Sequence, residues 1–298
     1  MKLGIGLPNA LAPAVNRGLL LDWARQADAA GFHTFGTIDR PGYDTWDPLV
    51  ALTAAAAVTE RVRLATTILQ LPARNELQVA QQAATLDRLS GGRVDLGVAV
   101  GHREGDFAAL GTKMKGRGRK LDRQIRKMRK TWRQARRGTD EQPSADGPAP
   151  IQKPSIPIWV GGKVEASRER AVKLGDGYVY GSRMRPTGEV RDEIAALRER
   201  ATAERKKRFT IAAIRYAAFG DTDALDRATE ITERYHGALP EAPEQFFLHG
   251  GAEEMLSSIK EYEAAGVDVL ILFPQVPDVR QVTGIGEHIL PAFRVPGA

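Results

Sequence analysis

The chain has 298 residues, of which 42% are hydrophobic and 27% are charged, a balance that is typical of a globular protein with a substantial core. It contains no cysteine, which excludes disulfides, thiolate nucleophiles and cysteine-ligated metal centres. No window has the roughly 18 uncharged apolar residues of a membrane span, and the first residues lack the apolar segment of a secretory signal. We therefore expect a cytoplasmic protein without a membrane partner.

The net charge of +6 is concentrated in one segment. Residues 113–137 contain 13 Lys or Arg and one acidic residue, whereas the rest of the chain has 30 basic and 36 acidic residues. Within this segment, Leu121, Ile125, Met128, Trp132 and Ala135 recur at helical spacing, which predicts one buried helix face surrounded by cations.

Short β-branched runs alternate with amphipathic stretches along the whole chain, which is typical of βα units and a parallel sheet. The predicted strands are 2–7, 34–39, 62–70, 94–100, 156–161, 177–181, 209–219 and 267–273. Helices are predicted between them, including 18–30, 48–59, 76–89, 165–174, 191–205 and 252–265. At three joints a helix ends in glycine just before a strand, which predicts a left-handed residue at Gly31, Gly175 and Gly266.

Eight βα units in about 250 residues predict a (β/α)₈ TIM barrel that fills residues 1–298 as a single domain. The doubly wound alternative requires a glycine-rich turn that opens a helix, but Gly4 and Gly6 lie inside the first strand and precede Pro8. Residues 138–156, rich in proline and without periodicity, predict an insertion between the fourth and fifth units, which we interpret as a lid.

Several segments resemble one family in order and at matching spacing. They include Asp47-Pro-Leu-Val-Ala-Leu, Thr59-Glu-Arg-Val-Arg-Leu-Ala-Thr-Thr, the stretch 82–101, Pro157-Ile-Trp-Val-Gly-Gly and Tyr262-Glu-Ala-Ala-Gly-Val. These resemble the bacterial luciferase-like family, over nearly the whole chain. The resemblance implies a barrel that binds flavin mononucleotide (FMN) or the deazaflavin coenzyme F420, and often a homodimer.

The resemblance also assigns cofactor-binding residues. The phosphate is expected at Gly161 and Gly162, with help from Gly181 and Ser182 after the sixth strand, where a helix start and glycines favour anions. Gly101, which follows the fourth strand, is also predicted to bind the cofactor. In the family a backbone bulge at Thr66, Thr67 and Ile68 backs the ring, often with a cis peptide, expected here between Thr67 and Ile68. Alternatively, these are ordinary turn and core residues.

Three residues are candidates for the reaction itself. Asp39 and Arg40 end the second strand, where many relatives have an acid followed by histidine; Arg40 does not titrate near neutrality, but it can hold an anionic substrate. His102 lies where some deazaflavin-dependent relatives have a glutamate that donates a proton, and its ordinary pKa of about 6.5 suits a general acid or base. The alternatives are an Asp39–Arg40 ion pair and a histidine in a surface loop.

The leading hypothesis is therefore hydride transfer between coenzyme F420 and a small organic substrate. The alternatives are an FMN-dependent two-component monooxygenase, supplied with reduced flavin by a separate reductase, and a non-catalytic flavin-binding barrel. For the cations of 113–137, the candidate partners are the polyglutamate tail of the deazaflavin, an acidic face of a second subunit and nucleic acid. Nucleic acid ranks last, because no aromatic stacking set accompanies the charges.

Overall fold

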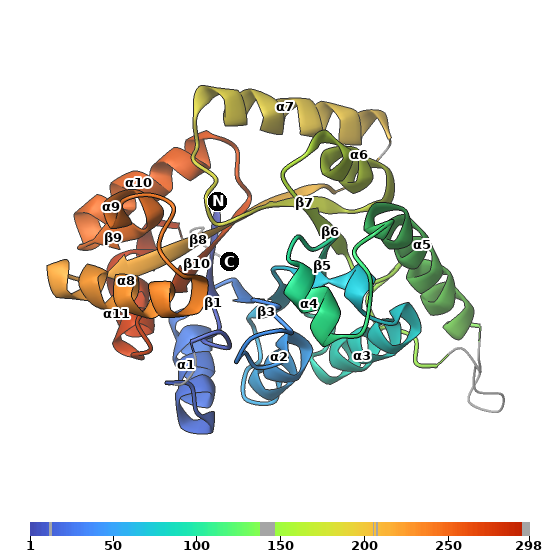
Figure 1. The fold of residues 1–298 in the computed structure, drawn as a ribbon, viewed down its shortest axis with the longest axis horizontal. Coiled ribbons are helices and arrows are strands. Elements are labelled where there is room, and N and C mark those ends of the chain that lie inside the picture. The colour runs from blue at the N-terminus through green and yellow to red at the C-terminus, as the bar shows by residue number, and fades with distance from the viewer. Residues whose placement is uncertain (12–13, 138–146, 205, 207, 294–298) are drawn as a thin grey trace.

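The computed structural model describes residues 1–11, 14–137, 147–204, 206 and 208–293. Its strands are β1 (Lys2–Gly6), β2 (Thr34–Thr37), β3 (Arg63–Thr66), β4 (Leu69–Gln70), β5 (Val94–Ala99), β6 (Ile158–Gly161), β7 (Gly177–Tyr180), β8 (Thr210–Phe219), β9 (Leu248–Gly250) and β10 (Val269–Pro274). Parallel pairing runs in the order β10–β1–β2–β3–β5–β6–β7–β8, and β10 also pairs with β8, which closes the barrel (Figure 1). The predicted TIM barrel is confirmed.

Helices cover the outside of this barrel and follow the strands in the expected βα order (Figure 1). They are α1 (Arg17–Ala30), α2 (Pro48–Ala56), α3 (Glu76–Leu89), α4 (Glu104–Ala109), α5 (Arg117–Ala135), α6 (Glu165–Leu174), α7 (Gly188–Ala203), α8 (Thr222–His236), α9 (Pro243–Phe246), α10 (Ala252–Ala264) and α11 (Arg280–His288), with short 3₁₀ turns η1 (Leu71–Ala73) and η2 (Leu290–Phe293). In the described part of the chain, no helix is long and apolar enough to cross a membrane.

Two buried clusters follow from the alternation of side chains along the strands. The larger one lies between the strands and the helices. The smaller one fills the barrel and includes Trp159, Ile214, Tyr216, Ile271 and Phe273. The predicted apolar face of α5 is buried as expected, at Leu121, Ile125, Met128, Trp132 and Ala135.

The glycine joints are left-handed in two of three places. Gly31 has φ 89° and Gly266 has φ 90°, as predicted. Gly175 is extended, with φ −95°, so the prediction of a left-handed residue is wrong there. Glycine is needed at Gly175 for a different reason: a Cβ atom would lie 2.9 Å from the Ala171 carbonyl oxygen and 3.1 Å from that of Ile158.

The predicted insertion falls partly outside the described residues, which omit 138–146. In the described remainder, the N–H groups of Ile151 and Gln152 donate to Asp87 Oδ2 at 2.7 and 3.0 Å, and Gln152 Nε2 donates to the Val94 carbonyl at 2.7 Å. Val94 begins β5, so residues 147–156 lie at the amino ends of the strands. The prediction of a lid over the carboxyl ends is therefore wrong for residues 147–156. Helix α5 has already returned the chain to the opposite face of the barrel before these residues begin.

Candidate active site

We call the carboxyl ends of the strands, with the loops that follow them, the mouth of the barrel. The third strand is interrupted here: β3 ends at Thr66, β4 begins at Leu69, and the peptide bond between Thr67 and Ile68 is cis. The Thr67 N–H donates to the Thr37 carbonyl at 2.8 Å, and the Thr66 hydroxyl donates to the Gly97 carbonyl at 2.7 Å. The bulge and cis peptide implied by the resemblance are present at residues 66–68.

Two glycines of neighbouring strands make room for this bulge. A Cβ atom at Gly97 would lie 2.1 Å from the Thr66 carbonyl oxygen, and one at Gly161 would lie 1.9 Å from Ile68 Cδ1. Gly161 was expected to open space for a phosphate, but Ile68 fills the space on its side-chain face. Gly161 is therefore required for packing, and any contact with a phosphate is left to its backbone.

The Gly161–Ile68 contact gives a stability prediction. Gly161→Ala should lower the free energy of unfolding by about 1–3 kcal/mol, because the added methyl group overpacks the site. Adding Ile68→Val removes the clashing Cδ1 atom and should recover part of that loss in urea unfolding. Gly188→Ala is the matched control, since a Cβ there meets nothing within 4 Å. A Gly161→Ala protein as stable as the wild type would contradict the packing role.

The loops after β5, β6 and β7 bring three cations together at the mouth, at Arg103, Lys163 and Arg183. Burial lowers the pKa of Lys163, and the charges of Arg183 and Arg103 lower it further, so both arginines lie within electrostatic reach of Lys163. In the described part of the chain, none of the three has an ion-pair partner. The rim therefore has a positive potential that the surrounding side chains leave uncompensated.

The same rim offers backbone and hydroxyl donors. Helix α6 begins at Glu165, and its N-cap residue Val164 provides no side-chain cap, which leaves first-turn N–H groups available. A Cβ at Gly181 would meet nothing within 4 Å, so the chain is open there. Ser182 hydrogen-bonds the buried side chain of Tyr216. Of the predicted phosphate residues, Gly181 thus lies beside open space, and Ser182 is next to Arg183 in the chain.

Asp39 forms a buried ion pair, but with Arg74 and not with its neighbour Arg40. Arg74 Nη2 donates to Asp39 Oδ1 at 2.7 Å, and the Asp39 side chain is 1% exposed. The Gln70 N–H donates to Asp39 Oδ2 at 2.8 Å, and Arg74 also pairs with Asp47 at 3.2 Å. Burial raises the pKa of Asp39 and Arg74 opposes the rise. The Asp39–Arg40 ion pair is not formed, and the Asp39 carboxylate is occupied.

Arg40 is buried at the mouth, and its guanidinium carbon lies 3.2 Å from the centroid of the Tyr43 ring. Such stacking orients a guanidinium without neutralising its charge. The loop around it is fixed by the Thr45 hydroxyl, which donates to the Arg40 carbonyl at 2.9 Å. A planar cation is thereby held beneath a largely exposed aromatic ring.

His102 is exposed in the loop between β5 and α4. Partial burial lowers its pKa below the ordinary value, the charges of Arg103, Lys163 and Arg40 lower it further, and Asp106 opposes them. The imidazole is therefore neutral at pH 7 and able to accept a proton. Gly101, with φ 73°, packs against Gln70 and Phe107. The structure thus brings Arg40, His102 and the rim cations into one electrostatic neighbourhood.

The sequence analysis missed Tyr216 as a site residue and the ion pair of Arg74 with Asp39. Tyr216 faces into the barrel, and burial raises its pKa, whereas Arg103 and Arg40 lower it. Its inward position could have been found from the alternation along β8 with Ile214 and Ala218. The ion pair of Arg74 had no such signal, because its partner Asp39 lies on another βα unit.

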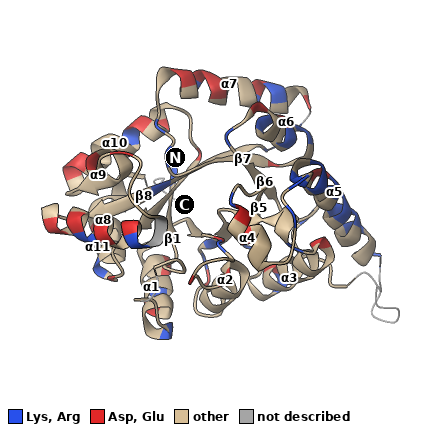
Figure 2. Cartoon of the chain, viewed as in Figure 1, with Lys and Arg blue, Asp and Glu red and all other residues tan. Residues whose placement is uncertain are grey.

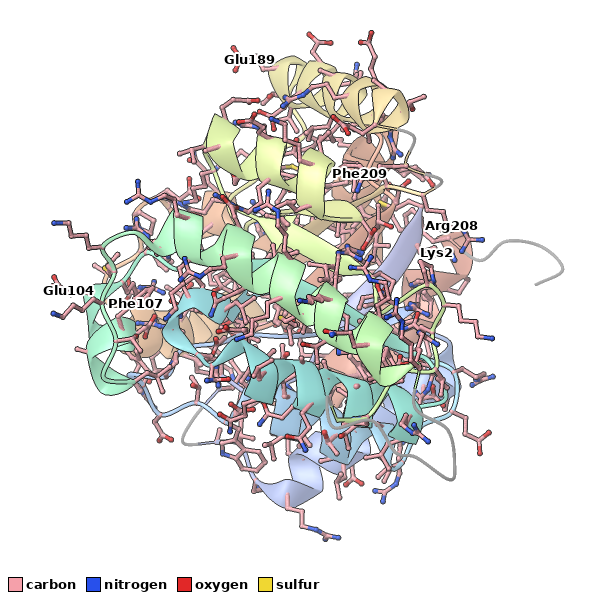
Figure 3. The ribbon with its side chains drawn as sticks, turned by 90° about the vertical axis from the view of Figure 1, so that its right-hand side faces the viewer. Lys2, Glu104, Phe107, Glu189, Arg208 and Phe209 are labelled. Atoms are coloured by element: carbon pink, nitrogen blue, oxygen red, sulfur yellow. The ribbon has the colours of Figure 1, made fainter. Side chains whose placement is uncertain are left out.

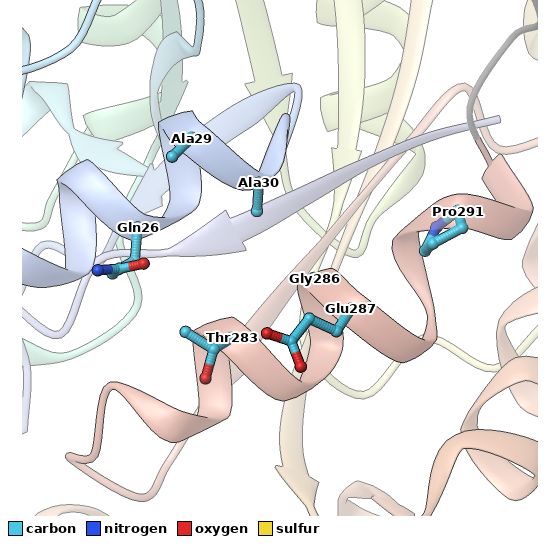
Figure 4. A pocket seen from close by; sticks show the side chains of 7 residues that line it. All are labelled: Gln26, Ala29, Ala30, Thr283, Gly286, Glu287 and Pro291. Atoms are coloured by element: carbon cyan, nitrogen blue, oxygen red, sulfur yellow. The ribbon is translucent and has the colours of Figure 1, made fainter.

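Other features lie away from the mouth. A groove of about 340 Å³ runs between α1 and α11, lined by Gln26, Ala29, Ala30, Thr283, Gly286, Glu287 and Pro291 (Figure 4). Ala30 precedes the joint at Gly31, so this groove is at the amino end of the barrel. Among the described residues, no group of three or more His, Cys, Asp or Glu could hold a metal ion.

Comparison with known proteins identifies the family. Residues 1–239 match the model of the luciferase-like monooxygenase family, and the chain belongs to this family. An uncharacterized protein of Mycobacterium tuberculosis is 35% identical over 141 residues, which cover 45% of this chain and 50% of that protein. The chain thus spans about half the length of that relative. The oxygenase component of a flavin-dependent trigonelline monooxygenase from Acinetobacter baylyi is 25% identical over 84% of this chain and 81% of its own.

Solved structures agree with this assignment. A monooxygenase from Streptomyces bottropensis superposes with a TM-score of 0.84 at 25% identity, covering 99% of this chain and 100% of its own. A coenzyme F420-dependent tetrahydromethanopterin reductase from Methanopyrus kandleri superposes with a TM-score of 0.74 at 17% identity, covering 99% and 100%. The second likeness establishes the fold alone. A flavin-dependent enzyme and an F420-dependent enzyme are therefore both among the proteins that this chain resembles.

Proposed function

We propose that this chain is an oxidoreductase that transfers a hydride between coenzyme F420 and a small organic substrate. The observation that supports it is the uncompensated positive rim of Arg103, Lys163 and Arg183 next to the bulge at residues 66–68. An anion site beside a flat, side-chain-poor stretch of barrel wall fits a phosphorylated, planar cofactor. The preference for the deazaflavin over FMN depends on those cations of α5 that have no ion-pair partner in the described part of the chain.

The residues at the mouth fit such a cofactor. Lys163, Arg183 and the start of α6 would hold its phosphate, Ser182 would contribute a hydroxyl, and the bulge would support its ring. Gly36, Gly97 and Gly161 keep the wall around the bulge free of further side chains, since an added Cβ would collide with Thr67, Thr66 or Ile68. When bound, the deazaflavin supplies the site that accepts or donates a hydride.

The chain's own side chains then act on the substrate. Arg40, stacked on Tyr43, is placed to hold an anionic or carbonyl group. His102, with its lowered pKa, accepts a proton from a substrate hydroxyl and returns it in the reverse direction. Asp39 acts indirectly, because its carboxylate is bound to Arg74 and to the Gln70 N–H. These contacts hold the loop after β2 in place at the mouth.

One observation favours the alternative function. Both monooxygenases named above are 25% identical to this chain over most of its length. An FMN-dependent monooxygenase would need a separate reductase as partner, because it consumes reduced flavin. Homodimeric assembly and a cytoplasmic location stay predictions under either function.

Titration of the apoprotein with coenzyme F420 and with FMN tests the proposal directly. We expect tighter binding of F420, turnover with reduced F420 and no oxygen consumption. Tighter binding of FMN, with oxygen consumed when reduced FMN is supplied, would replace the proposal by the monooxygenase. Tight binding without turnover of either cofactor would instead support the non-catalytic barrel.

Removing the rim cations should weaken cofactor binding. Each charge-assisted contact of Lys163 or Arg183 with a phosphate contributes about 1.5–3 kcal/mol, so either alanine variant should raise the Kd about tenfold to a hundredfold. Arg25→Ala, in an exposed pair with Asp22 on α1, is a matched control. Unchanged Kd values in both rim variants would show that the phosphate lies elsewhere.

A further inference from the structure

Helix α5 has a continuous stripe of exposed cations along its outer face. Arg119, Arg123, Arg126, Lys130, Arg133 and Arg137 follow one another at spacings of four, three, four, three and four. This places them on one side of the helix, opposite its buried apolar face. Figure 2 shows α5 as a dense band of basic residues, and Figure 3 shows the helix crossing the outside of the barrel between α3 and α6.

In the described part of the chain, no carboxylate neutralises this stripe. The carboxylates near α5 are bound by other cations: Asp122 by Arg170, Glu76 by Lys127, and Asp176 by Arg129. Like charges at helical spacing destabilise a helix by a few tenths of a kcal/mol per pair. An extended anion along the stripe would remove this repulsion.

The stripe begins at the mouth and ends at the opposite face of the barrel. At the start of the helix, Arg117 Nε donates to the Gly101 carbonyl at 3.1 Å and Lys120 donates to the Pro72 carbonyl at 2.7 Å, both at the mouth. Near its end, Arg129 pairs with Asp176, in the joint before β7. Figure 3 shows this course from the side of Glu104 and Phe107 to the side of Lys2 and Arg208.

The first turns of α5 also adjoin the phosphate side of the mouth. The Gly118 carbonyl accepts from Arg170 Nη2 at 3.5 Å, and Arg170 lies on α6, the helix that begins just after Lys163. Exposed Lys113 and Lys115 in the preceding loop add to the charge there. The upper end of the stripe therefore adjoins α6, the helix that follows the loop of Lys163.

We propose that the upper end of this stripe, at Arg119 and Arg123, binds the oligoglutamate tail of coenzyme F420 together with Lys115 of the preceding loop. The inference rests on the proposed function, because FMN has no such tail. Side chains three and four residues apart on a helix are about 5–6 Å apart, so successive guanidinium groups can each meet one carboxylate of a chain of linked glutamates. A tail that leaves a phosphate held at Lys163 would reach this end of α5 across α6, which contacts α5 through Arg170.

A nucleic acid fits the same surface less well. Single strands are held by aromatic side chains together with cations, and the exposed aromatic residues of the described chain, Tyr43 and Trp46, lie in the loop after β2 and not on α5. The acidic helices α8 and α10 of a second copy are another candidate (Figure 2). Both alternatives are outcomes of the test below.

The test compares F420 bearing several glutamates with the same cofactor lacking the tail, with Kd measured from cofactor fluorescence and no turnover required. At low salt, wild-type protein should bind the tailed form about tenfold more tightly, the sum of three exposed ion pairs. Lys115→Gln/Arg119→Gln/Arg123→Gln should abolish this difference and leave the Kd of the tail-less form unchanged. Lys130→Gln/Arg133→Gln/Arg137→Gln, an equal charge change at the far end, should preserve it, and added salt should remove it in every protein.

Each other result overturns the inference in a recognisable way. Equal binding of both forms by wild-type protein removes the tail site and the structural argument for the deazaflavin over FMN, while the binding itself still supports the proposed function. No binding of either form removes the proposed function as well. If the tail preference persists in the upper-end variant, or that variant instead loses affinity for a labelled oligonucleotide or dissociates a dimer in gel filtration, the stripe serves another partner. Thermal unfolding of both triple variants verifies that they are folded.

Discussion

Replacing Arg74 with methionine is expected to lower the free energy of unfolding by about 3–5 kcal/mol at neutral pH, the usual cost of removing one partner of a buried ion pair. The Asp39 side chain is 1% exposed and would stay buried. It would keep the hydrogen bond from the Gln70 N–H but would lose its ion pair. Methionine retains most of the side-chain volume, so the loss reports charge more than packing. Urea unfolding at pH 7 measures it.

The pH dependence of that loss identifies its cause. Burial already raises the pKa of Asp39, and Arg74 restrains the rise. Without Arg74 the folded protein should hold a proton at pH values where the unfolded carboxyl, with a pKa of about 3.9, has released it. The folded state then binds more protons, so stability falls as pH rises from the unfolded to the folded pKa, and the variant should recover towards the wild type in acid.

Asp39→Asn combined with Arg74→Met supplies the control. Asparagine still accepts a hydrogen bond from the Gln70 N–H, but it has no charge that would be left buried without a partner. The double variant should therefore be more stable than Arg74→Met alone at pH 7 and should lack its steep dependence on pH. A double variant as unstable as the single one would show that Arg74 acts through packing and not through Asp39.

The strands of this barrel could be predicted because their signal is local. Alternation along β8 and the apolar runs of β5 and β10 suffice to define a strand, whatever lies elsewhere in the chain. The bulge at residues 66–68 is different: three threonine and isoleucine residues in a β-branched run look like plain strand. Only the family resemblance predicted the interruption, and the glycines that permit it, Gly97 and Gly161, lie on other strands.

What could not be predicted depends on contacts between distant units. Asp39 is next to Arg40 in sequence, but both lie in the loop after β2, which ends at Thr37, and Arg74 from the following unit takes the carboxylate. The segment 147–156 was misplaced for a related reason. A loop that follows a helix returns to the amino ends of the strands, whatever its composition, so proline content alone could not put it over the mouth.

Replacement of His102 by glutamine should lower kcat by about 10²–10⁴, the range for loss of a general acid or base, with little change in the Kd of the cofactor. The pKa of His102 is lowered by burial and then by Arg103 and Lys163. In the direction that removes a proton from the substrate, the neutral imidazole is required. Activity should therefore be full above this pKa, which lies below the ordinary 6.5, and should fall as pH drops through it.

The His102→Gln variant should lack this fall in activity at low pH, which is the acidic limb of the pH–activity profile. Glu104→Gln, a neighbouring change at the start of α4, should keep the limb. Lys163→Ala separates the two causes of the lowered pKa: loss of that cation should raise the pKa of His102 and move the limb to higher pH. A histidine NMR titration gives the same pKa without any substrate. If the acidic limb survives in His102→Gln, another group handles the proton. If it is lost there but unmoved in Lys163→Ala, the charge of Lys163 does not set the pKa of His102, and burial and Arg103 are left as its causes.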